Sequence, residues 1–202
     1  MDDAVLIQCA QGGDLEAFNR LVLDYQDMLY NQAYRVIGEP DAAEDATQEA
    51  FISAYRKLHT YRGGSFKGWL LRIVTNACYD ELRQRKRKPV APLEPRNEDG
   101  EEFESPAWIV DPGESPEQAI QRRELAGAIQ WCLDQLSTDF RMVVVLVDVQ
   151  GLDYAEASQV IEKPLGTVKS RLARARHRMQ DCLQKFRELL PSAFRLREEA
   201  SV

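Results

Sequence analysis

Residues 151–179, GLDYAEASQVIEKPLGTVKSRLARARHRM, constrain the fold more than any other stretch. They contain two short helical patterns that meet at Pro164, which suits a turn or a first helical position because proline lacks the N–H that a first turn leaves unpaired. A rotation of about 100° per residue places the apolar side chains of the second pattern on one stripe: Val168, Leu172, Ala175 and Met179. Two such helices around a turn predict a helix-turn-helix.

The opposite face of the second pattern is polar and cationic, and consists of Lys169, Ser170, Ala173, Arg174 and His177. Residues 163–187 hold eight Lys or Arg against one acid. Cations at this density neutralise phosphates and release counterions, so binding to nucleic acid should weaken steeply with salt. The alternative is an ordinary solvated helix. The paired helix and the turn favour a face that enters a major groove.

Residues 91–119 separate this unit from the rest of the chain. They hold five of the nine prolines, and nine acids against one base, so their net charge is −8. Since the whole chain has a net charge of −7, the remaining residues have a net charge of +1. Proline and charge oppose packing, so we expect a linker about 30 Å long on average and about 90 Å when stretched. The predicted fold is all-α, with two small helical domains (residues 1–90 and 120–187), this acidic linker between them, and a C-terminal tail (residues 188–202).

The first domain begins with apolar residues at helical spacing from Asp14 to Ile37. A second helix is expected from Asp41 to Leu58, with small apolar side chains facing inward. Its outward face presents a compact polar patch at i, i+3 and i+4, made of Asp45, Gln48 and Glu49. By spacing alone, this patch fits an ordinary solvated helix face equally well.

A third helix is expected from Trp69 to Arg87, followed by the helix-terminating Pro89. Its polar side includes Arg72, Asn76, Asp80 and Arg83, and it closes in the run RQRKRK at residues 83–88. This concentration of cations predicts a second nucleic-acid face.

The segment between these helices, HTYRGGSFKGW at residues 59–69, alternates aromatic and cationic side chains, namely Tyr61, Arg62, Phe66, Lys67 and Trp69. Such side chains can stack on unpaired bases and hold their backbone. The alternative is that Phe66 and Trp69 cap the core, and both uses can coexist in one small domain.

The second domain is expected to open with a helix from about Glu117 to Leu136, and Ser137 can cap a further helix that reaches about Val149. The run MVVVLVDV at residues 142–149 has strand propensity. We nevertheless predict a helix, because the apolar positions around it keep helical spacing and a lone strand would lack a pairing partner.

The composition also indicates the cellular compartment in which we expect the protein. No apolar run approaches the roughly 20 residues of a membrane span, and the N-terminus lacks a basic leader before an apolar core, so we expect a cytoplasmic protein without direct membrane insertion. The four cysteines, Cys9, Cys78, Cys132 and Cys182, lie far apart, with no CxxC pair. We therefore expect small buried hydrophobes in a reducing compartment rather than a zinc site or a disulfide, and no metal or other cofactor.

Three segments, in this order, resemble an extracytoplasmic-function (ECF) sigma factor of bacteria: DAAEDATQEAFISAYRKL at residues 41–58, TYRGGSFKGWLLRIVTNACYDELRQRKR at residues 60–87 and GTVKSRLARAR at residues 166–176. The resemblance extends from about residue 6 to 185, apart from the linker. It implies a stress-responsive promoter-specificity subunit that binds core RNA polymerase, directs it to promoter DNA and starts strand separation. Sigma region 2 would occupy the first domain and region 4 the second.

The resemblance also implies residue roles. Asp45, Gln48 and Glu49 match the polymerase-binding patch, and Asn76, Asp80 and Arg83 match the signature beside the minus-ten element. The loop from Tyr61 to Lys67 matches the segment that captures a flipped base of the melted non-template strand. Lys169, Ser170, Arg171, Ala173 and Arg174 match positions that contact the double-stranded minus-thirty-five element. An inhibitory anti-sigma factor, often membrane-bound, is a further expected partner.

Two other classes fit less well. A conventional dimeric regulator, with the first domain as sensor, would not need that domain's own basic helix and base-stacking loop. An enzyme has little support, because His59 and His177 lie in different domains and Gly63-Gly64 alone makes no phosphate loop.

Overall fold

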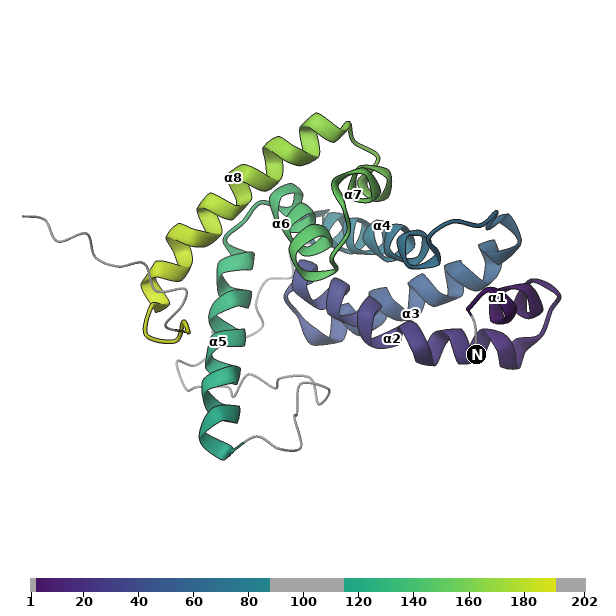
Figure 1. The fold of residues 1–202 in the computed structure, drawn as a ribbon, viewed down its shortest axis with the longest axis horizontal. Coiled ribbons are helices and arrows are strands. Elements are labelled where there is room, and N and C mark those ends of the chain that lie inside the picture. Colours follow the sequence, from purple (N-terminus) through teal and green to yellow (C-terminus); the bar gives the residue numbers. More distant parts are fainter. Residues whose placement is uncertain (1–2, 88–114, 192–202) are drawn as a thin grey trace, which may run out of the picture.

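The computed structural model describes residues 3–87 and 115–191 (Figure 1). Within these two ranges every regular element is helical, which confirms the all-α prediction. The first range contains α1 (Asp3–Gln11), α2 (Leu15–Ile37), α3 (Pro40–Lys57), η1 (Leu58–Thr60) and α4 (Phe66–Arg87). The second contains α5 (Pro116–Asp134), α6 (Thr138–Val144), η3 (Val145–Val149), α7 (Tyr154–Ile161), α8 (Leu165–Leu183) and η4 (Gln184–Phe186).

The first bundle consists of α1 to α4. Asp14 caps α2 by accepting hydrogen bonds from the N–H groups of Glu16 and Ala17, and Gly38 ends it in the left-handed conformation at φ 85°. The side of α3 that faces α2 and α4 is made of small buried side chains: Ala43, Ala46, Ala50 and Ala54. Small side chains allow the helix axes to lie close together. Because the alanine side of α3 is the packed side, its polar residues point outward.

Two features of this bundle differ from the sequence prediction. The helix α1 was not predicted, since nine residues are too short for a clear periodic signal. The helix α4 begins at Phe66 rather than Trp69, because the Ser65 hydroxyl accepts the N–H of Gly68 at 3.0 Å, as an N-cap residue does.

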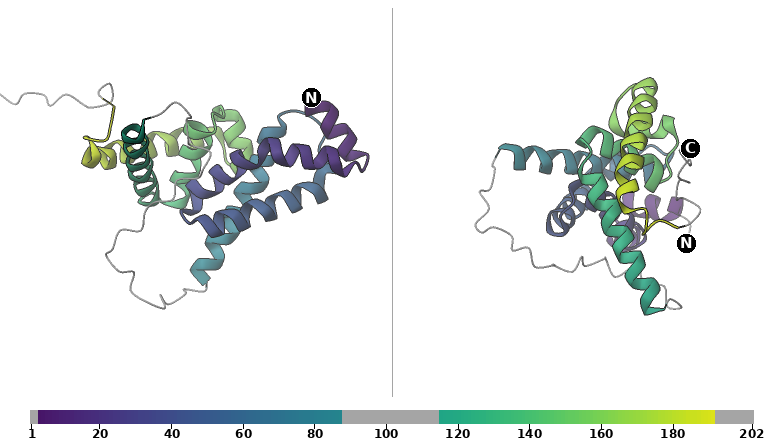
Figure 2. Two further views of the ribbon diagram at one scale, coloured as in Figure 1. Left: turned by 90° about the horizontal axis from the view of Figure 1, so that it is seen from below. Right: turned by 90° about the vertical axis from the view of Figure 1, so that its left-hand side faces the viewer.

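The second bundle consists of α5 to α8, and α5 stands at a steep angle to α2 and α3 (Figures 1 and 2). The apolar run at residues 142–149 is helical, as predicted, but its second half widens into the single π-helical turn η3. Met142, Val143, Val145 and Leu146 are fully buried there. The strand propensity of these residues is thus outweighed by their packing in a helix that is buried on several sides.

The predicted linker ended at residue 119, and this boundary was wrong. Ser115 and Gln118 form a capping box, and Pro116 occupies the first helical position, where its fixed φ is compatible with a helix. The proline that was taken as a helix breaker therefore starts α5. The predicted linker residues 91–114 and tail residues 192–202 lie outside the described part of the chain.

The two bundles pack against each other, whereas the sequence favoured separate small cores. One continuous set of buried side chains runs from α1 to α8, and α6, α7 and η3 rest on α2 and α4 (Figure 1). Met142 of α6 is 0% exposed, and its sulfur accepts hydrogen bonds from Gln32 of α2 at 3.4 Å and from Thr75 of α4 at 3.6 Å. The buried Gln32 amide and Thr75 hydroxyl of the first bundle thus find an acceptor in the second bundle.

Charged side chains complete this contact. The Arg141 guanidinium donates to the Val36 carbonyl at 2.7 Å and to the Asp134 carboxylate at 2.8 Å, both from Nη1. Burial lowers the pKa of Arg141 and raises that of Asp134. Gly38 admits this arrangement, because a Cβ at that position would lie 2.8 Å from an oxygen of Asp134.

The cysteine prediction was wrong at three of four positions. Cys132 and Cys182 form a disulfide, and Cys9 is exposed; Cys78 is buried, as expected. A separation of 50 residues gives no spacing signal in the sequence, because the pair is created by the packing of α5 on α8.

No metal site was expected, and within residues 3–87 and 115–191 the structure brings together no group of three or more potential metal ligands. No helix in those ranges is long and apolar enough to cross a bilayer.

Replacing Met142 with alanine should lower the free energy of unfolding by about 2–5 kcal/mol, because it opens a cavity at the contact between the bundles and leaves Gln32 and Thr75 without their acceptor. Urea denaturation measures this change. Leu23→Ala is the control, since Leu23 is 59% exposed and its loss should cost under about 0.5 kcal/mol. Equal losses for the two variants would contradict the packing described above.

Candidate nucleic-acid and polymerase-binding surfaces

The helix-turn-helix is held by local hydrogen bonds. Asp153 and Glu156 form a capping box at the start of α7, and Glu162 ends α7 in the left-handed conformation at φ 54°. The Ser158 hydroxyl donates to the Lys163 carbonyl at 2.5 Å, which fixes the turn before Pro164. These contacts set the direction in which α8 leaves the turn.

The predicted inner stripe of α8 is confirmed. Val168, Leu172 and Ala175 are buried, and Met179 is half-buried against the same core. The polar positions on the other side are all exposed: Lys169, Ser170, Ala173, Arg174 and His177. The exposed face is therefore open to a groove-sized partner and carries the cations that phosphates attract.

Arg171 lies apart from this face. Its side chain is 22% exposed and forms an ion pair with Asp139 of α6 at 2.7 Å. Asp139 also accepts a hydrogen bond at 3.5 Å from the hydroxyl of Tyr79 in α4. Burial raises the pKa of Tyr79 to about 12. Arg171 is thus engaged at the contact between the bundles, and the sequence gave no sign of this.

A second internal ion pair involves Arg176. It binds the Asp148 carboxylate through two hydrogen bonds of 3.1 and 2.5 Å, and these raise its pKa. The pair joins α8 to η3 and so supports the orientation of the recognition helix rather than a ligand contact.

The polar side of α4 contacts the second bundle near the start of the helix. Asn76, Asp80 and Arg83 are exposed, and Arg83 pairs with Asp80 at 3.3 Å. Arg72, nearer the start of α4, instead forms an ion pair with Glu162 at the end of α7. The part of this face closest to the aromatic loop therefore contacts the helix-turn-helix, although the Arg72 side chain stays exposed.

The aromatic loop joins η1 to α4. Tyr61, Phe66 and Trp69 form a cluster with ring centroids 5.3 to 5.6 Å apart. Phe66 is only 5% exposed, so in this arrangement it belongs to the core, whereas Tyr61 and Trp69 are half-buried. Gly63 and Gly64 adopt φ values of 100° and 93°, which side chains other than glycine rarely tolerate.

The cations of this loop have different surroundings. Arg62 is exposed, whereas the Lys67 ammonium donates to the Gln150 carbonyl of the second bundle at 2.5 Å. This hydrogen bond uses one of the three N–H donors of the Lys67 ammonium.

The helix α1 supports the loop, which the sequence did not indicate. The Gln11 amide donates to the carbonyls of Leu58 and Tyr61 at 2.9 and 3.0 Å. An open hollow of about 730 Å³ lies between α1 and the loop, and its lining includes Gln8, Gln11, Tyr25, Tyr61, Arg62 and Lys67. Aromatic rings and hydrogen-bonding groups together suit a planar base.

The third surface is the polar patch of α3. Asp45, Gln48 and Glu49 are exposed, while Ala46 and Thr47 between them are buried. Glu44 extends the patch, since its carboxylate accepts a hydrogen bond from the Gln48 amide at 3.3 Å. The packed second bundle leaves this acidic surface open.

These observations agree with comparisons to known proteins. A family model described as sigma-70 region 2 matches residues 21–88, and one described as sigma-70 region 4 matches residues 126–179. The chain is 38% identical over 183 residues to the RNA polymerase sigma-H factor of Pseudomonas aeruginosa, covering 90% of this chain and 94% of that protein. It is 35% identical over 189 residues to the ECF RNA polymerase sigma-E factor of Escherichia coli K12, covering 91% and 95%.

Solved structures show the same fold. CnrH, in complex with the cytosolic domain of CnrY, matches with a TM-score of 0.63 and 25% identity, over 91% of this chain and 97% of that chain. The sigma factor RpoE of Bartonella quintana, crystallised with the anti-sigma factor NepR, matches with a TM-score of 0.62 and 28% identity, over 84% and 98%.

The fold and the two matched regions define a sigma-70-type transcription initiation factor. Within that class, the chain belongs to the ECF family of RNA polymerase sigma factors. The resemblance inferred from the three sequence motifs is confirmed, and with it the function: a promoter-recognising factor that binds core RNA polymerase and promoter DNA.

Proposed function

We propose that three surfaces divide the work of this sigma factor. The α8 face contacts the minus-thirty-five element, α4 and the aromatic loop recognise and melt the minus-ten element, and the α3 patch binds core polymerase. The observation that carries the proposal is the exposed polar face of α8, which includes Lys169 and Arg174 and lies on the other side of the helix from the buried residues Val168, Leu172 and Ala175. The corresponding domains would be residues 1–90 and, with the start of α5 included, residues 116–187.

For the minus-ten element, the support is the exposed row Asn76, Asp80 and Arg83 on α4 and the hollow beside the loop. Tyr61 and Trp69 are the aromatic side chains placed to stack on a flipped base, and Arg62 can hold its phosphate. A stacking role for Phe66 would require it to leave the core.

The packed bundles must separate to read both promoter elements. The elements are centred about 25 base pairs apart, or roughly 85 Å of B-form DNA at 3.4 Å per pair, whereas α7 rests directly on α4. The chain between Arg87 and Ser115 can span about 90 Å when extended. Since the α3 patch is exposed in the packed form, polymerase can bind first and separation can follow.

The same proposal places the protein in the cytoplasm and assigns it no catalytic chemistry, since RNA synthesis belongs to the polymerase. It also includes an anti-sigma factor as partner. The support is that both structural relatives were solved as complexes, one of them explicitly with an anti-sigma factor.

Lys169→Ala and Arg174→Ala should each weaken promoter binding by the polymerase holoenzyme by about 1–3 kcal/mol, because each removes an exposed cation from the DNA-facing side of α8. Titration of promoter DNA at several salt concentrations measures both the affinity and its salt dependence. Arg20→Ala is the control, since it removes an exposed cation from α2. Unchanged binding and transcription by both α8 variants would remove the basis for this assignment.

Reversing the charge of the α3 patch with Asp45→Lys and Glu49→Lys should reduce the affinity for core polymerase at least tenfold, because it places cations where an acidic surface is proposed to meet the partner. Analytical gel filtration and fluorescence titration measure this loss.

Asp27→Lys, on the exposed side of α2, is the matched control and should bind normally. Full binding by the α3 variant would show that polymerase contacts another surface.

A further inference from the structure

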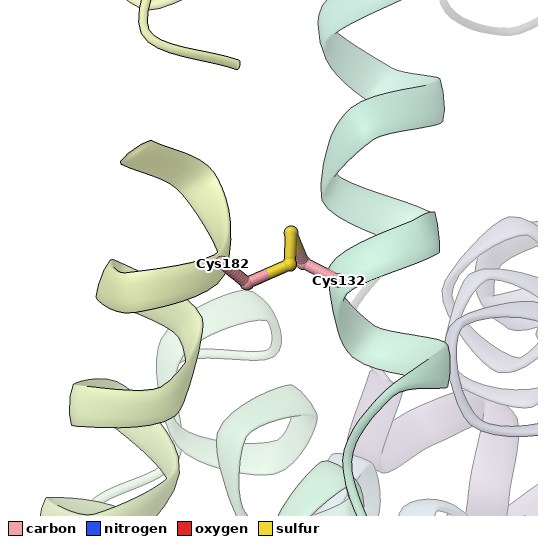
Figure 3. Close-up of a disulfide and its surroundings, with 2 residues drawn as sticks. All are labelled: Cys132 and Cys182. Atoms are coloured by element: carbon pink, nitrogen blue, oxygen red, sulfur yellow. A yellow bond between two sulfur atoms is a disulfide. The ribbon is translucent and has the colours of Figure 1, made fainter. Parts of the chain in front are cut away.

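The disulfide joins two helices that are distant in the sequence. Cys132 lies near the end of α5 and Cys182 in the last turn of α8, with Cα atoms 5.7 Å apart (Figure 3). The covalent ring closed by this bond contains α6, η3, α7 and the whole DNA-facing side of α8. The bond therefore encloses the complete helix-turn-helix.

The end of α8 is less deeply buried than its start. The fully buried positions of α8 stop at Ala175, and Met179 is half-buried. Beyond Cys182, Phe186 meets the edge of Trp131 at 5.5 Å and the Lys185 ammonium lies 5.7 Å from the Trp131 ring, which is 42% exposed. The disulfide thus adds a covalent constraint beyond the last fully buried position of α8.

The two sulfurs differ in access. Cys132 is 1% exposed, whereas Cys182 is half-buried on the outer helix. In the reduced form an oxidant would reach Cys182 first, and Cys132 would lie beside it as the second thiol. Both belong to a protein proposed to work in a reducing compartment, where disulfides generally form as a response to oxidants.

We propose that Cys132 and Cys182 are a reversible oxidation site: hydroperoxides convert the dithiol into the disulfide, and the disulfide keeps the helix-turn-helix folded under conditions that unfold the reduced form. Formation of the disulfide and stabilisation of the fold concern this chain alone, whereas the consequence for transcription rests on the proposed function of α8.

The chemistry balances with hydrogen peroxide as oxidant. The Cys182 thiolate attacks one peroxide oxygen, an S–O bond forms and the O–O bond breaks, and the leaving hydroxide takes a proton to become water. The Cys132 thiol then attacks the sulfenic sulfur, the S–S bond forms, and the S–O bond breaks with release of a second water. Two thiols lose two electrons in total, and one peroxide becomes two waters.

The test uses the full chain with Cys9→Ser, which removes the exposed thiol that could link two molecules. Cys78 can stay, because it is fully buried and burial raises the pKa of its thiol to about 12. The protein is reduced with dithiothreitol, treated with hydrogen peroxide, and digested for mass spectrometry.

The expected product is a peptide linked through Cys132 and Cys182, which dithiothreitol cleaves again. The melting temperature from circular dichroism should rise by at least about 5 °C on oxidation, because the bond restricts the unfolded chain. With Cys182→Ser added, peroxide should leave the melting temperature at that of the reduced parent. After incubation between the two melting temperatures, only the oxidised form should support transcription with core polymerase.

Absence of the linked peptide, a linked peptide with an unchanged melting temperature, or a bond that dithiothreitol cannot reduce would each overturn the proposal. Equal transcription from both forms after the heat step would do so as well. The comparison of reduced and oxidised parent needs no cysteine variant at the bond. Peptide and melting measurements need neither polymerase nor DNA, so a failure of the α8 assignment would appear separately, as unchanged transcription by the Lys169→Ala and Arg174→Ala variants.

Discussion

The contact of α6 with α2 and α4 determines the form in which this protein displays its binding surfaces. Met142 fills the space between the bundles and gives two buried polar groups, on Gln32 and Thr75, an acceptor. Arg141 adds hydrogen bonds to the Val36 carbonyl and to Asp134 at the edge of the same contact. Because these hydrogen bonds and one continuous apolar core cross the boundary, the two regions form one folded body rather than two independent ones.

This packing treats the three functional surfaces differently. The acidic patch of α3 and the outer face of α8 remain exposed, whereas Arg72 and Lys67 on the minus-ten side are bound by Glu162 and the Gln150 carbonyl. The contacts that hold these two cations are a surface ion pair and a single hydrogen bond, which are weak individually. Under the proposed function, negatively charged DNA offers both cations a competing partner, so the proposed minus-ten surface can become available without unfolding either bundle.

Helical spacing, caps and motif order were enough to predict α2 and α3, the helical conformation of α6 and η3, and the buried and exposed sides of α8. The family followed from the same residues. Periodicity assigns a side chain to a face but does not show what covers that face. This is why the partners of Arg171 and Lys67 were not foreseen, and why burial of Phe66 was only one of two alternatives. The disulfide and the α1 support for the loop also arise from tertiary packing, since Cys132 and Gln11 meet partners 50 and 47 to 50 residues away.

A distance measurement tests the account most directly. Spin labels at positions 26 on α2 and 180 on α8, both exposed, would be introduced in a background with the native cysteines replaced. The free protein should give one narrow, short distance distribution, and the complex with core polymerase and promoter DNA should give a distance longer by tens of ångströms. The same short distance in a complex that is making transcripts would contradict the claim that packed bundles separate to read the promoter.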